Sequence, residues 1–395
     1  MPKLTIDQVD LRDKRVFLRA DLNAPLEAGT VSDDTRLRAV VPTIRHAFAG
    51  GAAVVLASHL GRPKGTRDPK YSLAPVAARM AALLGQPVPL APDCVGGETA
   101  ALVKTLRVGE VLLLENLRFH PEEEANDDGF ARELAALADV YVNDAFAAAH
   151  RAHASIEAIT HHLHPAAAGL LMRSELEALG RILESPQRPL VAILGGAKVS
   201  DKVTLVEHLL ERVDALAIGG GMAFTFLAAL GHAIGRSLFE ADRVEPARRV
   251  FDSARRRGVS IALPVDAVVA QGLDAPSGRT VGVREIPADQ MGLDIGPRTV
   301  ERFADVVKTA GTVVWNGPMG VFEKAPFAAG TLGVARAVAG ASAFSVIGGG
   351  DTIAAVNQAG VADRIGYIST AGGAFLEFLE GRTLPGVEAL TEASR

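Results

Sequence analysis

The segment LVAILGGAKVSDK, residues 190–202, runs from five apolar residues through two glycines to two lysines four positions apart. The apolar run predicts a buried strand, and the residues after the glycines predict a helix on which Lys198 and Lys202 share a face. The segment does not match the phosphate-loop pattern G-x-x-x-x-G-K-[ST], and no other part of the chain does. It is therefore either a phosphate-binding turn of another kind or an ordinary junction between a strand and a helix.

The rest of the chain repeats this alternation of short apolar runs and helical patterns. Such a rhythm predicts an α/β architecture with parallel sheets, and a length of 395 residues predicts two domains. Between Pro165 and Pro189 the pattern changes to one longer helix, which is the best candidate for a connector between the domains. The apolar positions of this predicted helix are Met172, Leu176, Leu179 and Leu183.

In the first half of the chain, four apolar runs end on polar residues that are rich in arginine. Because ligands bind outside the carboxyl ends of parallel strands, these side chains predict one crevice for a small, multiply anionic ligand. Any one of them is explained equally well as a salt-bridge or helix-capping residue, and the fourfold repetition favours the crevice. The residues are Arg19, Asp21, Asn23, Ser58, His59, Arg62, Glu115, Asn116, Arg118, Asn143, Asp144, His150, Arg151 and His153, with Arg36 from a loop.

In the second half, four apolar runs end on glycine, in ILGGAK, AIGGGMAF, VVWNGPMG and SVIGGGDT. Glycine lets several backbone amides approach one phosphate closely, so these turns predict a nucleotide crevice. None matches G-x-G-x-x-G, which disfavours a dinucleotide. Asp351 follows Gly348, Gly349 and Gly350, where a carboxylate would repel phosphate unless Mg²⁺ lay between them; a plain helix N-cap is the alternative.

Composition restricts the remaining classes. A net charge of -5 gives no reason to expect a nucleic-acid partner. The single cysteine, Cys94, has no internal disulfide partner and the chain start lacks an apolar signal region, so we expect a cytoplasmic protein. Residues 215–235 carry no charge over the length of a membrane span, but their five glycines and the strand–helix rhythm predict a buried strand, a turn and a core helix instead.

An anion crevice and a Mg-nucleotide crevice together predict phosphoryl transfer, in which positioning and positive charge supply most of the catalysis. An alcohol acceptor would need a general base, whereas a carboxylate is already ionised at pH 7, and the residues alone leave this choice open. Two other readings remain. A bilobed anion-binding protein would lack catalysis, and a dinucleotide-dependent dehydrogenase would bind NADH and be indifferent to magnesium.

The motifs, taken in order, resemble the phosphoglycerate kinase family from the first strand to the last helix. They are RADLNAP (19–25), DDTRLRAVVPTI (33–44), SHLGRP (58–63), LLENLRFHPEEEAND (113–127), VNDAF with HRAH, GGAKVSDK, IGGGMAFTF, LPVD, DIGP, VVWNGPMGVFE, IGGGDT and GRTLPG. The resemblance implies reversible phosphoryl transfer from 1,3-bisphosphoglycerate to ADP with Mg²⁺, in a monomer without nucleic-acid or membrane partners. It also implies two Rossmann-like three-layer lobes with the active site in the cleft between them. The implied parts are a phosphoglycerate lobe (1–165), a connecting helix (166–188), a nucleotide lobe (189–374) and a tail (375–395) that returns to the first lobe.

Carried over residue by residue, the resemblance assigns three sets. Phosphoglycerate would be bound by Asp21, Asn23, Arg36, His59, Arg62, Arg118 and Arg151. The nucleotide would be bound by Gly195, Gly196, Lys198, Lys202, Gly220, Gly221, Asn316, Glu323, Gly348, Gly349, Gly350, Asp351 and Thr352, with Glu323 on the ribose and Asp351 on the magnesium. The transferred group would meet Arg36, Lys198 and the amides of Gly372 and Gly373. Because the two substrates bind different lobes, closure about the connector should accompany catalysis.

The chain departs from the family pattern in two places. In STAGGAF, Ala371 replaces the first of three glycines and Phe375 stands where a small polar residue is common, while Ala147 replaces a glycine before Arg151. A Cβ atom at 371 would cost about 1–2 kcal/mol if the backbone φ there were positive. We therefore expect slightly altered turnover rather than its loss.

Overall fold

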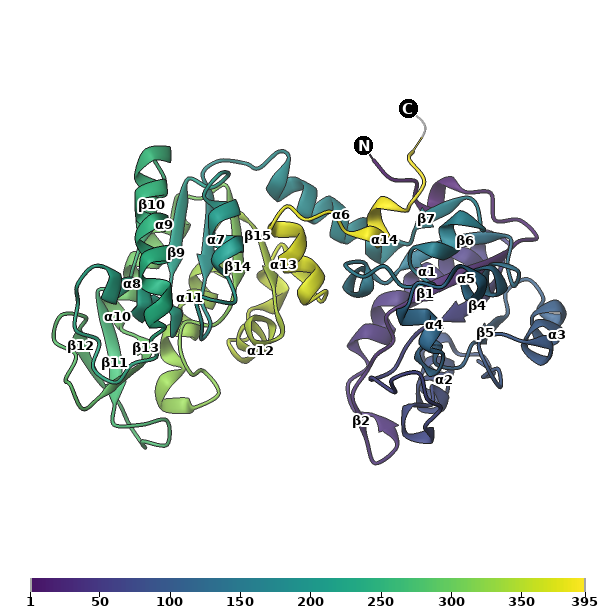
Figure 1. The fold of residues 1–395 in the computed structure, drawn as a ribbon, viewed down its shortest axis with the longest axis horizontal. Helices are drawn as coiled ribbons and strands as arrows, with labels where there is room; N and C mark the ends of the chain where they lie inside the picture. The colour runs from purple at the N-terminus through teal and green to yellow at the C-terminus, as the bar shows by residue number, and fades with distance from the viewer. Residues whose placement is uncertain (1, 394–395) are drawn as a thin grey trace. The chain divides into compact units, whose positions relative to one another are not determined.

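The computed structural model describes residues 2–393. The chain forms two compact units (Figure 1). One unit contains the residues up to Glu177 together with those from Thr383 onward, and the other contains Ala178–Arg382. The predicted α/β class with two lobes is confirmed.

The first unit is built on a five-stranded parallel sheet with the order β5-β4-β1-β6-β7. Its central strands are buried on both faces, as expected for parallel strands that helices cover on either side. Apolar residues of α1 and α2 pack against β1 and β4 in one core. The strands are β1 (Arg15–Ala20), β4 (Ala53–Ala57), β5 (Val111–Leu113), β6 (Val140–Asp144) and β7 (Ala166–Ala168), and β2 (Leu26–Glu27) and β3 (Thr30–Val31) form a separate two-stranded sheet. The helices are α1 (Thr35–Ala49), α2 (Ala74–Leu84), α3 (Gly97–Thr105), α4 (Pro121–Glu124), α5 (Asp128–Ala135) and α14 (Pro385–Glu388).

The predicted connector is helix α6 (Leu170–Leu183), which is shorter than the predicted range 166–188. Residues 166–168 form β7 and pair with β6, so they belong to the sheet of the first unit. The start of α6 is fixed by Asp144 at the end of β6, whose carboxylate accepts hydrogen bonds from the amide of Met172 (2.9 Å) and the hydroxyl of Thr43 (2.5 Å). The boundary between the two units falls within this helix, after Glu177.

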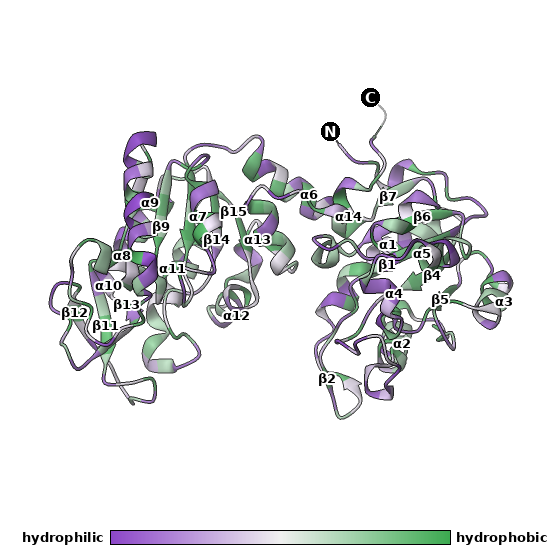
Figure 2. Cartoon of the chain, in the orientation of Figure 1, coloured by the Kyte–Doolittle hydropathy of each residue, from purple (hydrophilic) through white to green (hydrophobic). Residues whose placement is uncertain are grey.

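The second unit is built on a six-stranded parallel sheet with the order β10-β9-β8-β14-β15-β16. Its core joins alternate residues of β8 and β14 to α10 and α11, and the intervening residues are buried too, which makes three layers. Figure 2 shows these strands as hydrophobic and the outer helix α9 as largely hydrophilic. The strands are β8 (Leu190–Leu194), β9 (Ala215–Ile218), β10 (Ser260–Ala262), β14 (Thr312–Asn316), β15 (Phe344–Gly348) and β16 (Tyr367–Ser369). The helices are α7 (Val203–Leu209), α8 (Met222–Ala229), α9 (Val244–Arg257), α10 (Pro297–Lys308), α11 (Ala329–Gly340), α12 (Gly350–Gln358) and α13 (Gly373–Leu379).

A small antiparallel sheet in the second unit was not predicted from the sequence. It has the order β12-β11-β13 and consists of β11 (Asp266–Ala270), β12 (Arg279–Gly282) and β13 (Met291–Ile295). The pairing of β11 with β13 is irregular between Val268 and Val269. The expectation of parallel sheets alone was therefore incomplete.

The C-terminal segment returns to the first unit later in the chain than predicted. Helix α13 lies in the second unit, so residues 375–382 are not part of the returning tail. From Thr383 onward the segment belongs to the first unit, where the amide of Gly386 donates to the carbonyl of Ala149 (2.9 Å) and that of Thr391 to the carbonyl of Ala166 (2.9 Å).

The uncharged segment 215–235 forms strand β9, the glycine turn, helix α8 and the loop that follows. Within residues 2–393, no helix combines the length and the apolar character needed to cross a membrane. The prediction of a buried strand and core helix for this segment is confirmed, since β9 and α8 are almost wholly buried.

Candidate active site

The polar strand ends of the first unit meet at one edge of its sheet. Strands β5, β4, β1 and β6 are parallel neighbours, so their carboxyl ends lie side by side. Arg36 reaches the same edge from the start of α1, where it pairs with Asp21. The other residues predicted to bind phosphoglycerate are Asp21 and Asn23 after β1, His59 and Arg62 after β4, Arg118 after β5 and Arg151 after β6.

Asp21 and Asn23 shape the site through their partners. The Asp21 carboxylate lies 2.5 Å from an Arg36 guanidinium nitrogen and also accepts a hydrogen bond from the amide of Asn23 (3.1 Å). The side-chain oxygen of Asn23 accepts from the amide of Gly61 (2.9 Å), which fixes the loop after β4. Asp21 therefore orients Arg36, and Asn23 ties two strand ends together.

Burial and a neighbouring buried arginine keep His59 neutral. Arg19 is fully buried, donates to the Ser155 hydroxyl (2.8 Å) and lies 3.2 Å from Nδ1 of His59. Burial, followed by the charges of Arg19 and Arg118, holds the pKa of His59 well below its usual value. Since a guanidinium can only donate, Nδ1 of the neutral ring accepts and the proton resides on Nε2. His59 can thus donate one hydrogen bond to an anion.

The remaining arginines leave positive charge available at this edge. Arg62 is exposed, and within residues 2–393 no carboxylate pairs with Arg62 or with Arg151. Arg151 is half-buried and its Nε donates to Nε2 of His150 (3.1 Å). Arg118 is buried, with Glu124 at 3.2 Å from its Nε. This surplus of charge suits a multiply anionic ligand.

Ala147, which replaces a glycine of the family pattern, is accommodated without backbone strain. It lies in the 3-10 turn Phe146–Ala148, and its φ is not in the left-handed region. Gly386 packs closely against Ala149, two residues after Ala147. A Cβ atom at 386 would lie only 2.9 Å from the Ala149 Cα atom. The loop that leads to Arg151 is thus a regular turn supported by the C-terminal segment.

In the second unit, the glycine turns after β8, β9 and β14 bond directly to one another. The amide of Gly195 donates to the carbonyl of Asn316 (2.9 Å), and that of Gly196 donates to the carbonyl of Pro318 (2.8 Å). Gly220 has φ +66°, and a Cβ atom there would lie 2.6 Å from the nitrogen of Gly196. The turns are packed backbone against backbone, which only glycine permits.

Lys202 lies in a cage of oxygen atoms formed by these turns. Its Nζ donates to the carbonyl of Gly195 (2.7 Å), the carbonyl of Asn316 (3.1 Å) and the side-chain oxygen of Asn316 (2.5 Å). Burial lowers the pKa of Lys202 to about 8, against the opposing charges of Asp201 and Asp351. The ammonium group is therefore present at neutral pH and tied to the strand ends.

The prediction that Lys198 and Lys202 share a helix face is wrong. Helix α7 begins only at Val203, so both lysines precede it, and Lys198 is exposed whereas Lys202 is half-buried with its Nζ in the cage. In the loop before the helix, the amides of Val199 and Ser200 donate to the carboxylate of Glu240.

The turn after β15 is linked to the same cage. The Asn316 side chain donates to the carbonyl of Gly348 (2.7 Å), and Gly349 has φ +96°. Asp351 is the second residue of α12 and is exposed, and the N-cap is Gly349. The alternative reading of Asp351 as the N-cap is therefore wrong. The hydroxyl of Thr352, which is buried, accepts a backbone hydrogen bond of 2.7 Å from the turn after β14.

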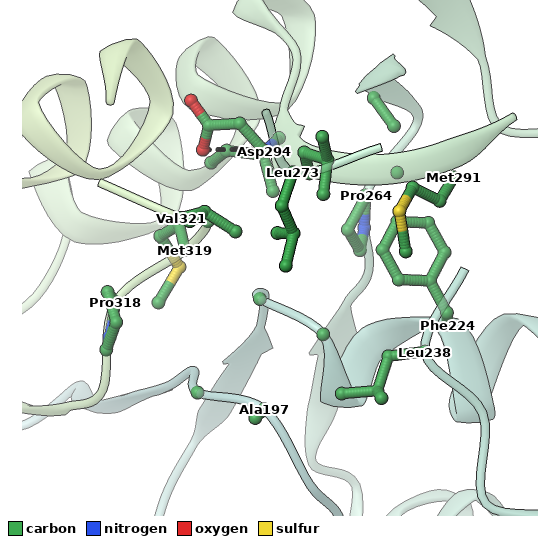
Figure 3. A pocket seen from close by; sticks show the side chains of 18 of the residues that line it. Ala197, Phe224, Leu238, Pro264, Leu273, Met291, Asp294, Pro318, Met319 and Val321 are labelled. Atoms are coloured by element: carbon green, nitrogen blue, oxygen red, sulfur yellow. Dashed lines mark hydrogen bonds between the residues drawn. The ribbon is translucent and has the colours of Figure 1, made fainter. Parts of the chain in front are cut away.

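A cavity of about 390 Å³ opens beside these turns (Figure 3). Its volume lies in the range of small-molecule sites. Five of the residues predicted to bind nucleotide line it, namely Gly196, Gly220, Gly221, Glu323 and Asp351. The other predicted nucleotide residues are not part of the lining.

Most of the cavity wall was missed by the sequence analysis. Its side chains are apolar and come from α8, from the loops around residues 238 and 273, from β13 and from the segment after β14. In the sequence, each of these residues resembles an ordinary core residue. Only the structure distinguishes two of them, because Leu238 and Leu273 are large apolar side chains that are 42% and 49% exposed. The apolar lining consists of Ala197, Phe224, Leu238, Pro264, Ala267, Leu273, Met291, Leu293, Ile295, Pro318, Met319 and Val321.

Asp294 is the one buried carboxylate in this lining. Burial raises its pKa to about 7, while the amides of Gly330 (2.6 Å) and Ile295 (2.9 Å) donate to its two oxygens. Through Gly330 it holds the first turn of α11. Asp294 therefore supports the wall of the cavity from behind.

The last glycine turn precedes α13. Gly372 has φ +56° and is its N-cap, whereas Ala371 is buried with a φ outside the left-handed region. The cost considered for a Cβ atom at 371 therefore does not arise. Phe375 is fully buried, and its ring occupies the space beside Gly348, where an added Cβ atom would lie 2.5 Å from the ring.

One group of metal-ligand residue types lies elsewhere, at Asp93, Cys94 and His120 of the first unit. The carboxylate of Asp93 already accepts from the Cys94 amide (2.7 Å) and lies 2.7 Å from Nε2 of His120. Burial raises the pKa of the Cys94 thiol well above its usual value. These contacts satisfy the group without a metal ion.

Comparison with known proteins identifies the family of the chain. The family model for phosphoglycerate kinase matches residues 6–382. A phosphoglycerate kinase of Moorella thermoacetica is 57% identical over 394 residues, covering 99% of this chain and 100% of the relative, and one of Koribacter versatilis is 55% identical over 401 residues with the same coverage. The solved structure of phosphoglycerate kinase from Coxiella burnetii superimposes with a TM-score of 0.92 at 43% identity and covers 98% of each chain. The resemblance found in the motifs is thus confirmed over nearly the full length, and the chain belongs to the phosphoglycerate kinase family.

Proposed function

We propose that the protein transfers a phosphoryl group directly from 1,3-bisphosphoglycerate to Mg-ADP, giving 3-phosphoglycerate and Mg-ATP, and that the transfer is reversible. The observation that carries this proposal is the pair of unlike anion sites at strand ends, one walled by arginines and the other by backbone amides and lysines. An acyl phosphate and a nucleotide diphosphate are both multiply anionic, and each matches one of these walls.

On the phosphoglycerate side, Arg36 acts on the transferred group and the other arginines hold the substrate's charges. Arg62 and Arg151 are available because no carboxylate of residues 2–393 pairs with them. His59 donates from Nε2, which the contact of its Nδ1 with Arg19 supports. Asp21 and Asn23 position Arg36 and the loop after β4.

On the nucleotide side, the apolar cavity holds the nucleoside and Glu323 contacts the ribose. The glycine turns and the two lysines receive the phosphates, and the amides of Gly372 and Gly373 face the transferred group. Magnesium arrives as part of the nucleotide substrate. A single exposed carboxylate, Asp351, fits it, since Mg²⁺ in nucleotide sites is held by few carboxylates together with phosphates and water.

The reaction needs no general base. The bond from phosphorus to the acyl oxygen breaks, a bond to a terminal oxygen of ADP forms, and both the leaving carboxylate and the attacking phosphate are anions at pH 7. Burial and nearby arginines hold the pKa of His59 well below its usual value and lower that of His153 to about 3. Both rings are therefore neutral at pH 7, and the reaction does not require either of them to act as a general acid or base. Catalysis then consists of positioning and charge stabilisation.

Because the two ligands bind to different units, the proposal includes an approach of the units when both are bound. X-ray scattering of the free and doubly liganded protein tests this part, and an unchanged radius of gyration would contradict it. The proposal also assigns the protein to the cytoplasm as a monomer. The single buried cysteine, Cys94, is compatible with a reducing compartment.

The test is a coupled assay of ATP-dependent phosphorylation of 3-phosphoglycerate with the parent protein, Lys198→Ala and Arg36→Ala. We expect Mg²⁺-dependent turnover by the parent and a loss of about 10²-fold or more in kcat for each variant, as for other removed transition-state donors. Parent protein that binds both ligands without forming ADP would favour an anion-binding protein. Tight NADH binding with no need for magnesium would favour a dehydrogenase.

A further inference from the structure

The segment from Arg236 to Glu240 runs between the nucleoside cavity and the lysine-bearing loop. The Ser237 hydroxyl accepts a hydrogen bond from the amide of Gly292 in the cavity wall (2.9 Å). Leu238 lines the cavity and packs on Gly221, where an added Cβ atom would lie 2.9 Å from the leucine side chain. One end of the segment is therefore part of the cavity.

The other end holds the loop through Glu240. One carboxylate oxygen of Glu240 accepts hydrogen bonds from the amides of Val199 (2.5 Å) and Ser200 (3.1 Å). The amide of Glu240 in turn donates to the buried hydroxyl of Thr225 in α8 (3.2 Å). Glu240 thus joins α8, which borders the cavity, to the two residues that follow Lys198.

Glu240 is ionised at neutral pH. Burial opposes its ionisation, but the hydrogen bonds from Ser200 and Val199, together with the charge of Arg243, keep the pKa below its usual value. Backbone amides bound by a carboxylate form charge-assisted hydrogen bonds, which are stronger than those to a neutral acceptor. The carboxylate is therefore a firm anchor for a loop that precedes Val203, the first residue of helix α7.

We propose that Glu240 is a positioning residue for phosphoryl transfer: it fixes the loop around Val199 so that the exposed Lys198 is held ready for the nucleotide phosphates. Residues 236–240 connect the nucleoside cavity to this loop. Binding of the nucleoside in the cavity therefore stabilises the loop around Val199, and an ordered loop favours nucleotide binding in turn. The proposal rests on the proposed function, since it takes Lys198 to contact the transferred phosphoryl group.

The sign of the effect separates positioning from simple electrostatics. A carboxylate near bound phosphates repels them, so removal of a merely repulsive charge would tighten nucleotide binding. Removal of a positioning residue has the opposite result, because Lys198 then has to be ordered when the nucleotide binds. The direction of the change in KM for the nucleotide decides between these two roles.

The experiment compares Glu240→Ala and Glu240→Gln with the matched control Glu245→Gln, which removes an exposed carboxylate whose ion-pair partner is Arg248. We expect Glu240→Ala to raise the KM for Mg-ATP about tenfold and to lower kcat, with the KM for 3-phosphoglycerate within about twofold. Glu240→Gln keeps an acceptor and should change the KM for Mg-ATP only about threefold. Glu245→Gln should match the parent.

Hydrogen exchange of the peptide around residues 195–203, measured by mass spectrometry without nucleotide, gives a second measurement. Protection of the Val199 and Ser200 amides should fall at least about tenfold in Glu240→Ala and remain largely intact in Glu240→Gln. If the alanine variant does not fold, the glutamine variant still decides through the KM for Mg-ATP: the expected rise of about threefold would support the proposal, and an unaltered KM would overturn it.

A lowered KM for Mg-ATP, or an equal change in both KM values, would also overturn it. Lys198→Ala in the same assay distinguishes the two levels of the argument. If Lys198→Ala is fully active, the assigned role of that lysine is wrong. If Lys198→Ala is impaired while Glu240→Ala behaves like the parent, only the positioning role of Glu240 is wrong.

Discussion

Gly348 and Phe375 should be energetically coupled, and a double-mutant cycle can measure this coupling. A Cβ atom at 348 would lie 2.5 Å from Cδ1 and 2.6 Å from Cε1 of the Phe375 ring, distances at which either the ring or the strand must move. Phe375 is fully buried, so the ring has no open space to enter. The departure from the family pattern at 375 is therefore tied to a glycine at the end of β15.

The structure sets the expected magnitudes. Gly348→Ala overpacks the core and should cost about 1–3 kcal/mol of unfolding free energy. Phe375→Ala removes a buried ring and should cost about 3–5 kcal/mol. In the double variant the new methyl group enters the space that the ring has left, so its cost should fall short of the sum by about 1–3 kcal/mol.

Urea unfolding followed by tryptophan fluorescence is the appropriate assay. Trp315 is the only tryptophan of the chain and lies in β14, which pairs with β15, so its emission reports on the second unit rather than on the whole protein. Phe375→Leu serves as a milder control. Costs that add within about 0.5 kcal/mol would refute the reasoning, because they would mean that the ring and the glycine do not share one space.

Three further predictions concern Lys202, Ala371 and Asp144. Affinity for Mg-ADP, measured by calorimetric titration, should fall about tenfold per pH unit above pH 8 as the Lys202 ammonium deprotonates, and Lys202→Met should lack this break. Ala371→Gly should change kcat less than about threefold because φ at 371 is not positive, and a gain above tenfold would contradict this. Burial raises the pKa of Asp144 from 3.8 to about 6, so between about pH 4 and 6 the unfolded state has lost this proton while the folded state keeps it, and the unfolding free energy falls by about 1.4 kcal/mol per pH unit. Asp144→Asn should lack that loss in urea unfolding followed by circular dichroism, and an equal loss in both proteins would contradict the assignment.

The strand ends could be predicted from the sequence because their signals are local. A buried strand followed by Asp21 and Asn23, or by Gly195 and Gly196, is visible within about ten residues, and the parallel sheets then bring such ends together. The chemistry of both sites lies at these positions. A local pattern was therefore sufficient to indicate an anion site in each half.

The cavity wall and the lysine cage could not be predicted, because they depend on contacts between distant segments. Leu238, Leu273 and Met291 look like core residues until the antiparallel sheet and its loops place them around one space. Lys202 was expected on a helix face, yet it precedes helix α7 and donates to carbonyl oxygens of Gly195 and Asn316, which lie at the ends of two strands far apart in sequence.

The cage of Lys202 explains how a phosphate site remains folded without its ligand. An unpaired buried ammonium would be costly, and here three oxygen atoms of Gly195 and Asn316 partner it. These oxygens are neutral, so they are weaker partners than a phosphate, which forms charge-assisted bonds. The phosphates of a bound nucleotide can therefore replace the cage oxygens as hydrogen-bond partners of Lys202. When no nucleotide is bound, the cage oxygens keep the ammonium group paired and the turns folded. The pKa of about 8 results from burial, opposed by the charges of Asp201 and Asp351, and the negative charge of a bound phosphate would raise it.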